Sequence, residues 1–260
     1  MPKRKEEDSD REDEGGEKGV LSVGEFALRM RVPFSMAVAS QRNSGKTLLI
    51  SVLIKDMLEL GKVEMVLVMS QTVHVNKDYA FLPPRLRQPF SEAVIKKLMD
   101  KQAAIPKKDR QQVLLVLDDV LSEKAAEQSR FIKRLYTLGR HYDINVILIS
   151  QTSNVALTQA IKQNSDYILY SRLNRYQLSS LWESITNMDK RDFIRYSEAH
   201  NKNYTFLCVD NTSQSNNPAD FILRIKASPA EVASIAVHDS DSENSSSESE
   251  TDASESEYEW

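Results

Sequence analysis

Near its N-terminal end, the chain has a short apolar run that leads into a polar loop and then into a helix-like segment. Residues 34–39 are mostly apolar, residues 40–45 are polar or glycine, and residues 46–60 have helical spacing with no breaker. Strand, loop and helix in this order form a nucleoside triphosphate site, because amide groups at the helix N-terminus attract phosphate. The sequence therefore predicts a phosphate-binding loop that ends in Gly45-Lys46-Thr47.

This loop departs from the usual pattern at one position. The pattern opens with a glycine that four residues separate from Gly-Lys, and here that position holds Ser40. The fingerprint is therefore partial, and the assignment depends on the motifs that follow. The residues predicted to contact nucleotide are Ser40, Gln41, Arg42, Asn43, Ser44, Gly45, Lys46 and Thr47.

Apolar runs alternate with helix-like segments through the middle of the chain. Strands are predicted at 34–39, 63–70, 113–117, 144–150, 167–170, 204–209 and 221–225, and helices at 46–60, 90–103, 122–139, 154–163 and 176–199. The runs 113–117 and 146–149 are continuously apolar, which is typical of strands buried on both faces of a parallel sheet. The alternation predicts an α/β fold with a mainly parallel sheet flanked by helices and right-handed crossovers.

Two carboxylates follow the third predicted strand. Asp118 and Asp119 stand where a buried apolar run ends, and such groups are costly there unless they face a site. In a P-loop enzyme the first carboxylate holds the Mg²⁺ shell, and the second orients or deprotonates the attacking water. The competing interpretation is that they cap the next helix.

Polar and basic residues flank the fourth predicted strand. Gln151 follows it, at the sheet edge where parallel strands place ligands, and is predicted to sense the γ-phosphate. Arg140 precedes the strand and is therefore expected at the opposite edge, away from its own phosphate site. It would then act on a neighbouring subunit as an arginine finger, or be an exposed turn residue. Arg172 and Arg175 are the alternative fingers or DNA contacts.

The charge is divided along the chain. Residues 239–260 carry nine acidic groups and no Lys or Arg, and residues 1–18 carry eight acidic and five basic groups. The overall charge of −4 therefore leaves +8 on residues 19–238. A basic body between acidic tails fits a polyanion-binding protein, or a basic surface with no nucleic-acid partner. We expect disordered tails at 1–19 and 238–260 around one domain at 20–237.

Several classes of protein do not fit the composition. The longest apolar runs are far shorter than the roughly 20 residues that a membrane helix needs, so no membrane partner is expected. Cys208 is the only cysteine, which excludes an intrachain disulfide and the usual cysteine-rich zinc sites. We expect a reducing compartment, the cytoplasm or the nucleus.

Four motifs of this chain together resemble those of the genome-packaging ATPases of large double-stranded DNA viruses. They are Ser-Gly-Lys-Thr, Leu-Asp-Asp, Gly-Arg-His and Ile-Ser-Gln-Thr. The poxvirus-type, virophage and Maverick-type enzymes of the FtsK–HerA superfamily share this set. The resemblance covers residues 30–210. It implies a RecA-like P-loop NTPase core, a ring oligomer, ATP and Mg²⁺ as cofactors, and double-stranded DNA with a capsid or portal as partners. By motif, Lys46 and Thr47 bind phosphate and Mg²⁺, Asp118 is the Mg²⁺-side carboxylate, and Asp119 stands at the catalytic acid. Gln151 is implied as the sensor and Arg140 as the finger.

The function that this resemblance implies is an ATP-hydrolysing motor that packages viral DNA. A helicase with the same core is the nearest alternative, although no strand-separating element is visible. A GTPase switch fits less well, because Asn76-Lys77-Asp78 lacks the spacing of a guanine reader. A regulatory or capsid-assembly protein that binds nucleotide with little turnover is the non-enzymatic alternative.

Overall fold

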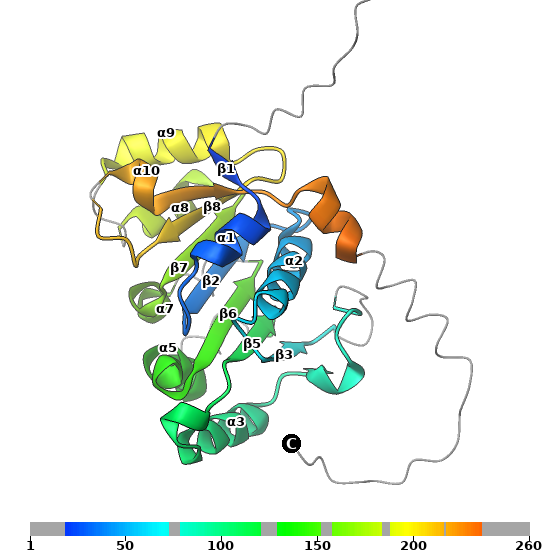
Figure 1. Cartoon of the computed structure of the whole chain (residues 1–260). Coiled ribbons are helices and arrows are strands. Elements are labelled where there is room, and N and C mark those ends of the chain that lie inside the picture. The colour runs from blue at the N-terminus through cyan, green and yellow to red at the C-terminus, as the bar shows by residue number, and fades with distance from the viewer. Residues whose placement is uncertain are drawn as a thin grey trace, which may run out of the picture.

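The computed structural model of the chain describes residues 19–72, 79–120, 129–151, 158–183, 188–215 and 217–235. Within them, nine strands form one sheet in the order β1-β9-β8-β7-β2-β6-β5-β3-β4 (Figure 1). The strands are β1 Val20–Leu21, β2 Ser35–Ser40, β3 Met65–Ser70, β4 Arg87–Gln88, β5 Val113–Asp118, β6 Ile144–Ser150, β7 Tyr167–Ser171, β8 Phe206–Asp210 and β9 Ile222–Ile225. The tails expected at 1–19 and 238–260 lie outside the described residues, apart from Gly19.

Most of the sheet is parallel, so the predicted α/β class is confirmed. Strands β4, β3, β5, β6, β2 and β7 pair in parallel. Strand β8 departs from the predicted regular alternation, because it is antiparallel to both β7 and β9. The edge pair β1–β9 is parallel again.

The antiparallel step at β8 has its cause in the helices that precede it. The single helix predicted at 176–199 is wrong: the segment holds α8 Arg175–Trp182 and α9 Lys190–His200. Asp189 begins the second helix by accepting from the amides of Arg191 and Asp192 at 2.8 and 3.3 Å. A single helix would bring the chain back to the end of the sheet where β7 begins. Two helices instead return it to the end where β7 stops. The next strand then runs the opposite way.

The other helices cover both faces of the sheet. They are α1 Val23–Arg29, α2 Lys46–Glu59, α3 Glu92–Ala104, α5 Arg130–Leu138, α7 Gln159–Asn164 and α10 Pro218–Phe221, with short 3₁₀ turns η1 Pro84–Leu86, η2 Lys107–Asp109 and η3 Gly139–Tyr142. Residues 229–235 form a last helix beside α2 (Figure 1). The first parts of the predicted helices 122–139 and 154–163 lie outside the described residues.

Alternate strand residues face two separate apolar cores. Leu114 and Val116 of β5 pack with α1 and α2, while Leu115 and Leu117 pack with α3, α5, α7, α8 and α9. All four side chains are fully buried, as the continuous apolar run predicts for a covered parallel strand. This double burial makes the sheet a rigid base, and functional side chains at its edges take their positions from it.

Helix α1 was not predicted. Ser22 and Glu25 form a capping box at its N-terminus, in which the Ser22 Oγ and the Glu25 carboxylate each accept a backbone amide. At its C-terminus, Lys62 Nζ donates to the carbonyls of Ala27, Leu28 and Met30 at 2.6–2.8 Å. The ammonium group thus satisfies carbonyls that a helix end leaves without partners.

Two further observations bear on the expected environment. Among the described residues, none of the helices combines the length and the apolarity that crossing a lipid bilayer requires. Cys208 lies buried in β8 as a free thiol, and burial raises its pKa well above the ordinary value.

Candidate nucleotide site

The predicted phosphate loop connects the end of β2 to the start of α2. Gly45 precedes the helix with a φ of +83°, and Asn43 has a φ of +56°. Both lie in the left-handed region, which glycine adopts freely and asparagine tolerates. Gly45 offers no side chain to the first amides of α2, so these donors remain available to an anion at the helix N-terminus.

The position of Ser40 shows why this loop does not need a glycine at its first position. It is still the last residue of β2 and pairs in register with Ser171 of β7. It has no positive φ, so a side chain fits there without strain. The hydroxyl groups of Ser40 and Ser44 are buried and have no hydrogen-bond partner among the described residues. Such groups are costly unless a ligand or water satisfies them, which supports a polar ligand in this loop.

The two predicted carboxylates stand at the same sheet edge as the loop. Asp118 ends β5, is only 7% exposed, and accepts a 2.8 Å hydrogen bond from the Tyr79 hydroxyl. Asp119 has a φ of +50° and accepts from both the backbone amide of Gln151, at 2.9 Å, and its side-chain amide. The left-handed turn therefore aims the Asp119 carboxylate at the end of the neighbouring strand β6.

Gln151 joins that carboxylate to the phosphate loop. Its side-chain oxygen accepts a 2.6 Å hydrogen bond from Arg42 Nε. Strand β6 lies between β2 and β5, so its C-terminal end is next to both the loop and Asp119. The structure thus brings Arg42, Gln151 and Asp119 into one hydrogen-bonded chain, which we call the loop–acid link.

The two alternative arginines have different surroundings. Arg172 follows β7 with a φ of +56°, and its guanidinium donates to the carbonyl of Asn43 at 3.2 Å. It therefore contacts its own phosphate loop. Arg175 pairs with Glu198 at 2.7 Å across α8 and α9 and is largely exposed. The Glu198 hydrogen bond raises the pKa of Arg175 and lowers that of Glu198.

Arg140 lies at the other edge of the sheet. It stands in η3 just before β6, and its guanidinium pairs with Asp166 Oδ1 at 2.6 Å. The second Asp166 oxygen accepts the backbone amide of Ser35, the first residue of β2, at 2.8 Å. The Arg140 side chain is 41% exposed. It is therefore separated from its own loop by the length of β2 and presents its guanidinium at the surface.

The oxygen groups at the loop edge suit Mg²⁺. Thr47 lies in the first turn of α2, and Asp118 lies at the end of β5. Mg²⁺ is usually held by one or two protein oxygens together with substrate phosphates, so this small donor set fits it. Within the described ranges, no group of three His, Cys, Asp or Glu side chains forms a larger metal cluster.

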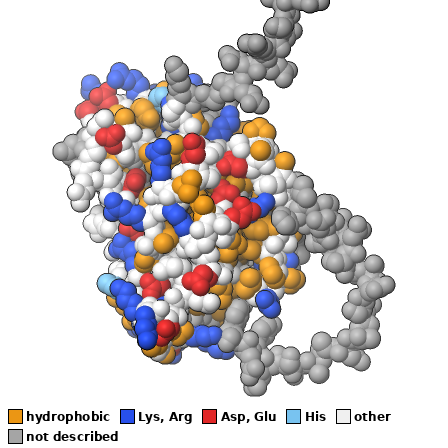
Figure 2. Space-filling model, in the orientation of Figure 1, with side chains coloured by type: hydrophobic (Ala, Val, Ile, Leu, Met, Phe, Trp, Pro, Cys, Tyr) orange, Lys and Arg blue, Asp and Glu red, His pale blue; other side chains and the backbone are white. Residues whose placement is uncertain are grey.

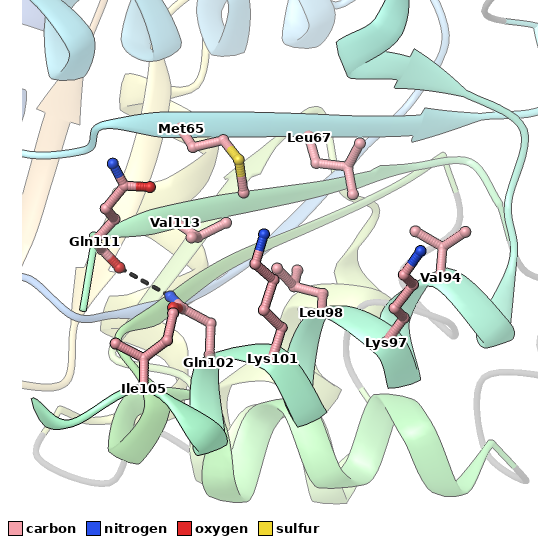
Figure 3. Close-up of a pocket in the computed structure, with 10 residues that line it drawn as sticks. All are labelled: Met65, Leu67, Val94, Lys97, Leu98, Lys101, Gln102, Ile105, Gln111 and Val113. Atoms are coloured by element: carbon pink, nitrogen blue, oxygen red, sulfur yellow. Dashed lines mark hydrogen bonds between the residues drawn. The ribbon is translucent and has the colours of Figure 1, made fainter. Parts of the chain in front are cut away.

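A separate apolar groove lies away from this edge. Figure 3 shows it between α3 and the first residues of β3 and β5, with Met65 and Val113 on the strand side and Leu98, Lys97 and Lys101 on the side of α3. Its volume is about 190 Å³. Because β3 and β5 begin here, the groove is at the opposite edge from the phosphate loop. It is not part of the nucleotide site.

Charged side chains do not form one block on the α1–α2 side. Figure 2 shows acidic and basic groups interspersed there, with several Lys and Arg side chains along the margin over α5 and α3. Exposed basic residues on α5 are Arg130, Lys133 and Arg134.

Sequence reasoning missed two residues of this region. Tyr79 contacts Asp118 from a loop 39 residues upstream, and Tyr204 places its ring against Gly45 from the turn before β8. No local pattern marks either residue. The sequence indicated only that the strand-end carboxylate of Asp118 needs a hydrogen-bond partner. It did not indicate that Tyr79 is that partner.

Comparison with known proteins gives a family and several similar folds. The family described as Poxvirus A32 protein matches residues 26–212, which is more than half of the chain. An uncharacterised protein 075L of Invertebrate iridescent virus 6 is 25% identical over 188 residues, covering 70% of this chain and 72% of its own. An uncharacterised protein L437 of Acanthamoeba polyphaga mimivirus is 28% identical over 159 residues, or 55% and 54% of the two chains.

Two solved structures share the fold at low identity. The genome-packaging NTPase B204 of Sulfolobus turreted icosahedral virus 2, in complex with AMP, has a TM-score of 0.56 and 15% identity, covering 76% of this chain and all of its own. The pCW3 conjugation coupling protein TcpA, with an ATP analogue, has a TM-score of 0.51 and 13% identity, covering 77% and 64%. At such identities the likeness is one of fold. The resemblance to the poxvirus-type family that the motifs predicted is confirmed by the family match.

Proposed function

We propose that this chain, which belongs to the Poxvirus A32 protein family, is an ATP-hydrolysing motor that moves double-stranded viral DNA into a capsid. The observation that carries the proposal is the loop–acid link, in which Arg42 of the phosphate loop holds Gln151 and Gln151 holds Asp119. Hydrolysis of a nucleoside triphosphate needs a cradle for the phosphates and an oriented group for the attacking water. The link connects the loop that would form the cradle to the carboxylate that would orient the water.

In this mechanism each residue has one task. The amides of the loop and Lys46 bind the phosphates of ATP, and Lys46 neutralises charge that develops on them. Asp119 orients the attacking water and accepts its proton, while Gln151 fixes the carboxylate in that direction. Thr47 and Asp118 would hold Mg²⁺, which supplies further neutralisation of phosphate charge when bound.

Translocation along DNA has separate support. B204 is described as the DNA-packaging ATPase of an icosahedral virus, and this chain shares its fold. Residues 19–238 carry a net charge of +8, which favours contact with a phosphate backbone. Such contact is independent of base sequence, as a packaging motor requires, and it weakens as the salt concentration rises. We infer that the bound polyanion is duplex DNA.

We further propose that the motor is a ring in which Arg140 enters the site of a neighbouring subunit. Arg140 and the phosphate loop lie at opposite edges of one sheet, so neither can serve the other within a chain. A head-to-tail ring would bring these two edges together at every interface. A finger in trans is typically worth 10³–10⁵ in turnover.

The experiment that tests the activity is steady-state ATP hydrolysis with and without duplex DNA. We expect DNA to stimulate turnover, Lys46→Ala to lower it by about 100-fold or more, and Asp119→Asn to lower it by about 10²–10⁴-fold. Arg134→Ala, an exposed arginine on α5, is the control for surface charge and should keep turnover without DNA. If the wild type binds ATP but never hydrolyses it, the chain is a nucleotide-binding regulatory protein instead.

Mixed rings test the finger. Arg140→Ala alone should lose turnover, and equal amounts of Arg140→Ala and Lys46→Ala should regain part of it. If subunits mix at random, about a quarter of the interfaces pair an intact loop with an intact Arg140. A melting curve of Arg140→Ala checks that loss of the Asp166 ion pair has not unfolded the chain. Failure of the mixture to recover any activity would argue against a finger in trans.

A further inference from the structure

An aromatic side chain stands beside the phosphate loop without being part of the apolar core. Tyr204 lies just before β8 and is 69% exposed, although it is one of the largest side chains in the molecule. Its ring is so close to the loop that a Cβ added at Gly45 would lie 3.3 Å from Tyr204 Cδ1. The ring therefore rests against the backbone that is expected to hold phosphate, and its remaining surface faces solvent.

The backbone that presents this ring is unusual. Asn203 and Tyr204 have φ values of +52° and +60°, and the turn is closed by the Thr205 amide, which donates to the carbonyl of Lys202 at 2.9 Å. Asparagine tolerates the left-handed region, whereas a bulky aromatic residue rarely adopts it. Strain of this kind persists where the surroundings hold the residue in place, and it is concentrated at ligand sites.

A cavity extends from this ring. It has a volume of about 240 Å³, and its walls include Tyr204, Gly45, Leu48 and Ala227. Leu48 is exposed at 39% even though it is a leucine in the first turn of α2. The volume is below the roughly 300–1,000 Å³ of whole-ligand sites, so the cavity suits part of a ligand whose remainder lies elsewhere. It meets the phosphate loop at Gly45.

The chemistry of the walls indicates what that part is. Of the described residues around the cavity, Lys226 alone is charged, and the others are apolar, aromatic or glycine. A flat aromatic face next to leucine side chains suits a planar heterocycle, which stacks on tyrosine irrespective of its hydrogen-bonding edge. The described walls contain no carboxylate or amide side chain to read that edge.

We propose that Tyr204 and this cavity hold the base of the nucleotide whose phosphates occupy the loop. The inference rests on the proposed function, since it requires that the loop bind a triphosphate. Because stacking strength grows with ring size, the site should favour purine over pyrimidine nucleotides. Because the described walls hold no carboxylate or amide side chain that could read the base edge, the site should discriminate little between adenine and guanine.

Calorimetric binding of two probes tests this. The first is a non-hydrolysable ATP analogue, and the second is inorganic tripolyphosphate, which has no base. Tyr204→Asn removes the ring but keeps a residue that tolerates the left-handed turn, and Tyr204→Phe keeps the ring. Tyr176→Asn removes the ring of another tyrosine, 80% exposed on α8, and is the matched control.

We expect Tyr204→Asn to weaken binding of the ATP analogue by about 5- to 100-fold and to leave tripolyphosphate binding within about twofold. Tyr204→Phe and Tyr176→Asn should bind both probes as the wild type does. Equal effects of Tyr204→Asn on both probes, or none on either, would overturn the inference while leaving the phosphate loop intact. Tripolyphosphate that binds no better to the wild type than to Lys46→Ala would instead overturn the proposed function, and this inference with it.

Discussion

At the scale of single residues, the site depends on how one carboxylate is held. Asp119 is placed by a left-handed backbone turn and by two hydrogen bonds from Gln151, while Gln151 in turn accepts from Arg42 Nε. These three residues come from three different segments. A movement of the phosphate loop can therefore reach the Asp119 carboxylate through the Gln151 side chain, and in the proposed mechanism this would align the carboxylate with the attacking water.

Arg42→Lys tests this transmission, because lysine keeps the positive charge but has no Nε in a planar guanidinium group. We expect kcat for ATP hydrolysis to fall by about 10- to 100-fold with a smaller change in KM, since the acid loses its alignment rather than its substrate. Arg134→Lys on α5 is the matched control. A raised KM with unchanged kcat would mean that Arg42 only binds nucleotide.

Much of this residue set was predictable. The strand-end positions of Asp118, Asp119 and Gln151 follow from apolar runs that stop at polar residues, and the parallel sheet brings those ends to one edge. The hydrogen bond from Arg42 was not predictable, because it depends on the loop conformation. The contacts of Tyr79 and Tyr204 join residues far apart in the sequence, and no spacing rule reports such pairs.

At the scale of elements, α2 has a second role besides presenting its N-terminus. Further along it, Asp56 is partly buried against Gly24 of α1 and near Glu231 of the last helix, 229–235. Its Oδ2 atom has no hydrogen-bond partner among the described residues. Burial, with the nearby charges of Glu231 and Glu59, raises the pKa of Asp56 from 3.8 to about 6.

The raised pKa of Asp56 predicts how the stability of the folded state changes with pH. Because the folded pKa is raised, the protonated carboxyl favours the folded state: its contribution is fully present below pH 3.8 and is lost as pH rises through about 6. Asp56→Asn cannot ionise, so its melting temperature relative to wild type should rise by about 2 °C between pH 4 and pH 7.5. Asp100→Asn, an exposed site on α3, is the control. A difference between Asp56→Asn and wild type that stays constant with pH would contradict the prediction.

The elements themselves were predictable to different degrees. The buried strands and α2 follow the predicted ranges closely, because continuous apolar runs and an uninterrupted helical period are strong local signals. The division of 176–199 into α8 and α9 was missed, although Asp189 is a good N-cap residue. Helix α1 is short, and the spacing of Ser22 and Glu25 was the available sign of its N-terminus.

At the scale of the whole molecule, the residues proposed to act in hydrolysis lie at two opposite edges of one sheet. The carboxyl edge carries the phosphate loop and the loop–acid link, and the amino edge carries Arg140 with Asp166. The antiparallel strands β8 and β9 extend the sheet on the side of Tyr204. In the proposed ring, a neighbour would supply Arg140 to each phosphate loop, which would couple hydrolysis to assembly.

Translocation along duplex DNA can be measured directly by displacement of a third DNA strand annealed to the duplex. A motor that moves along double-stranded DNA should release the third strand in the presence of ATP and leave the duplex paired, and Lys46→Ala should release none. Separation of the duplex strands would identify a helicase instead. ATP hydrolysis without any release of the third strand would contradict translocation.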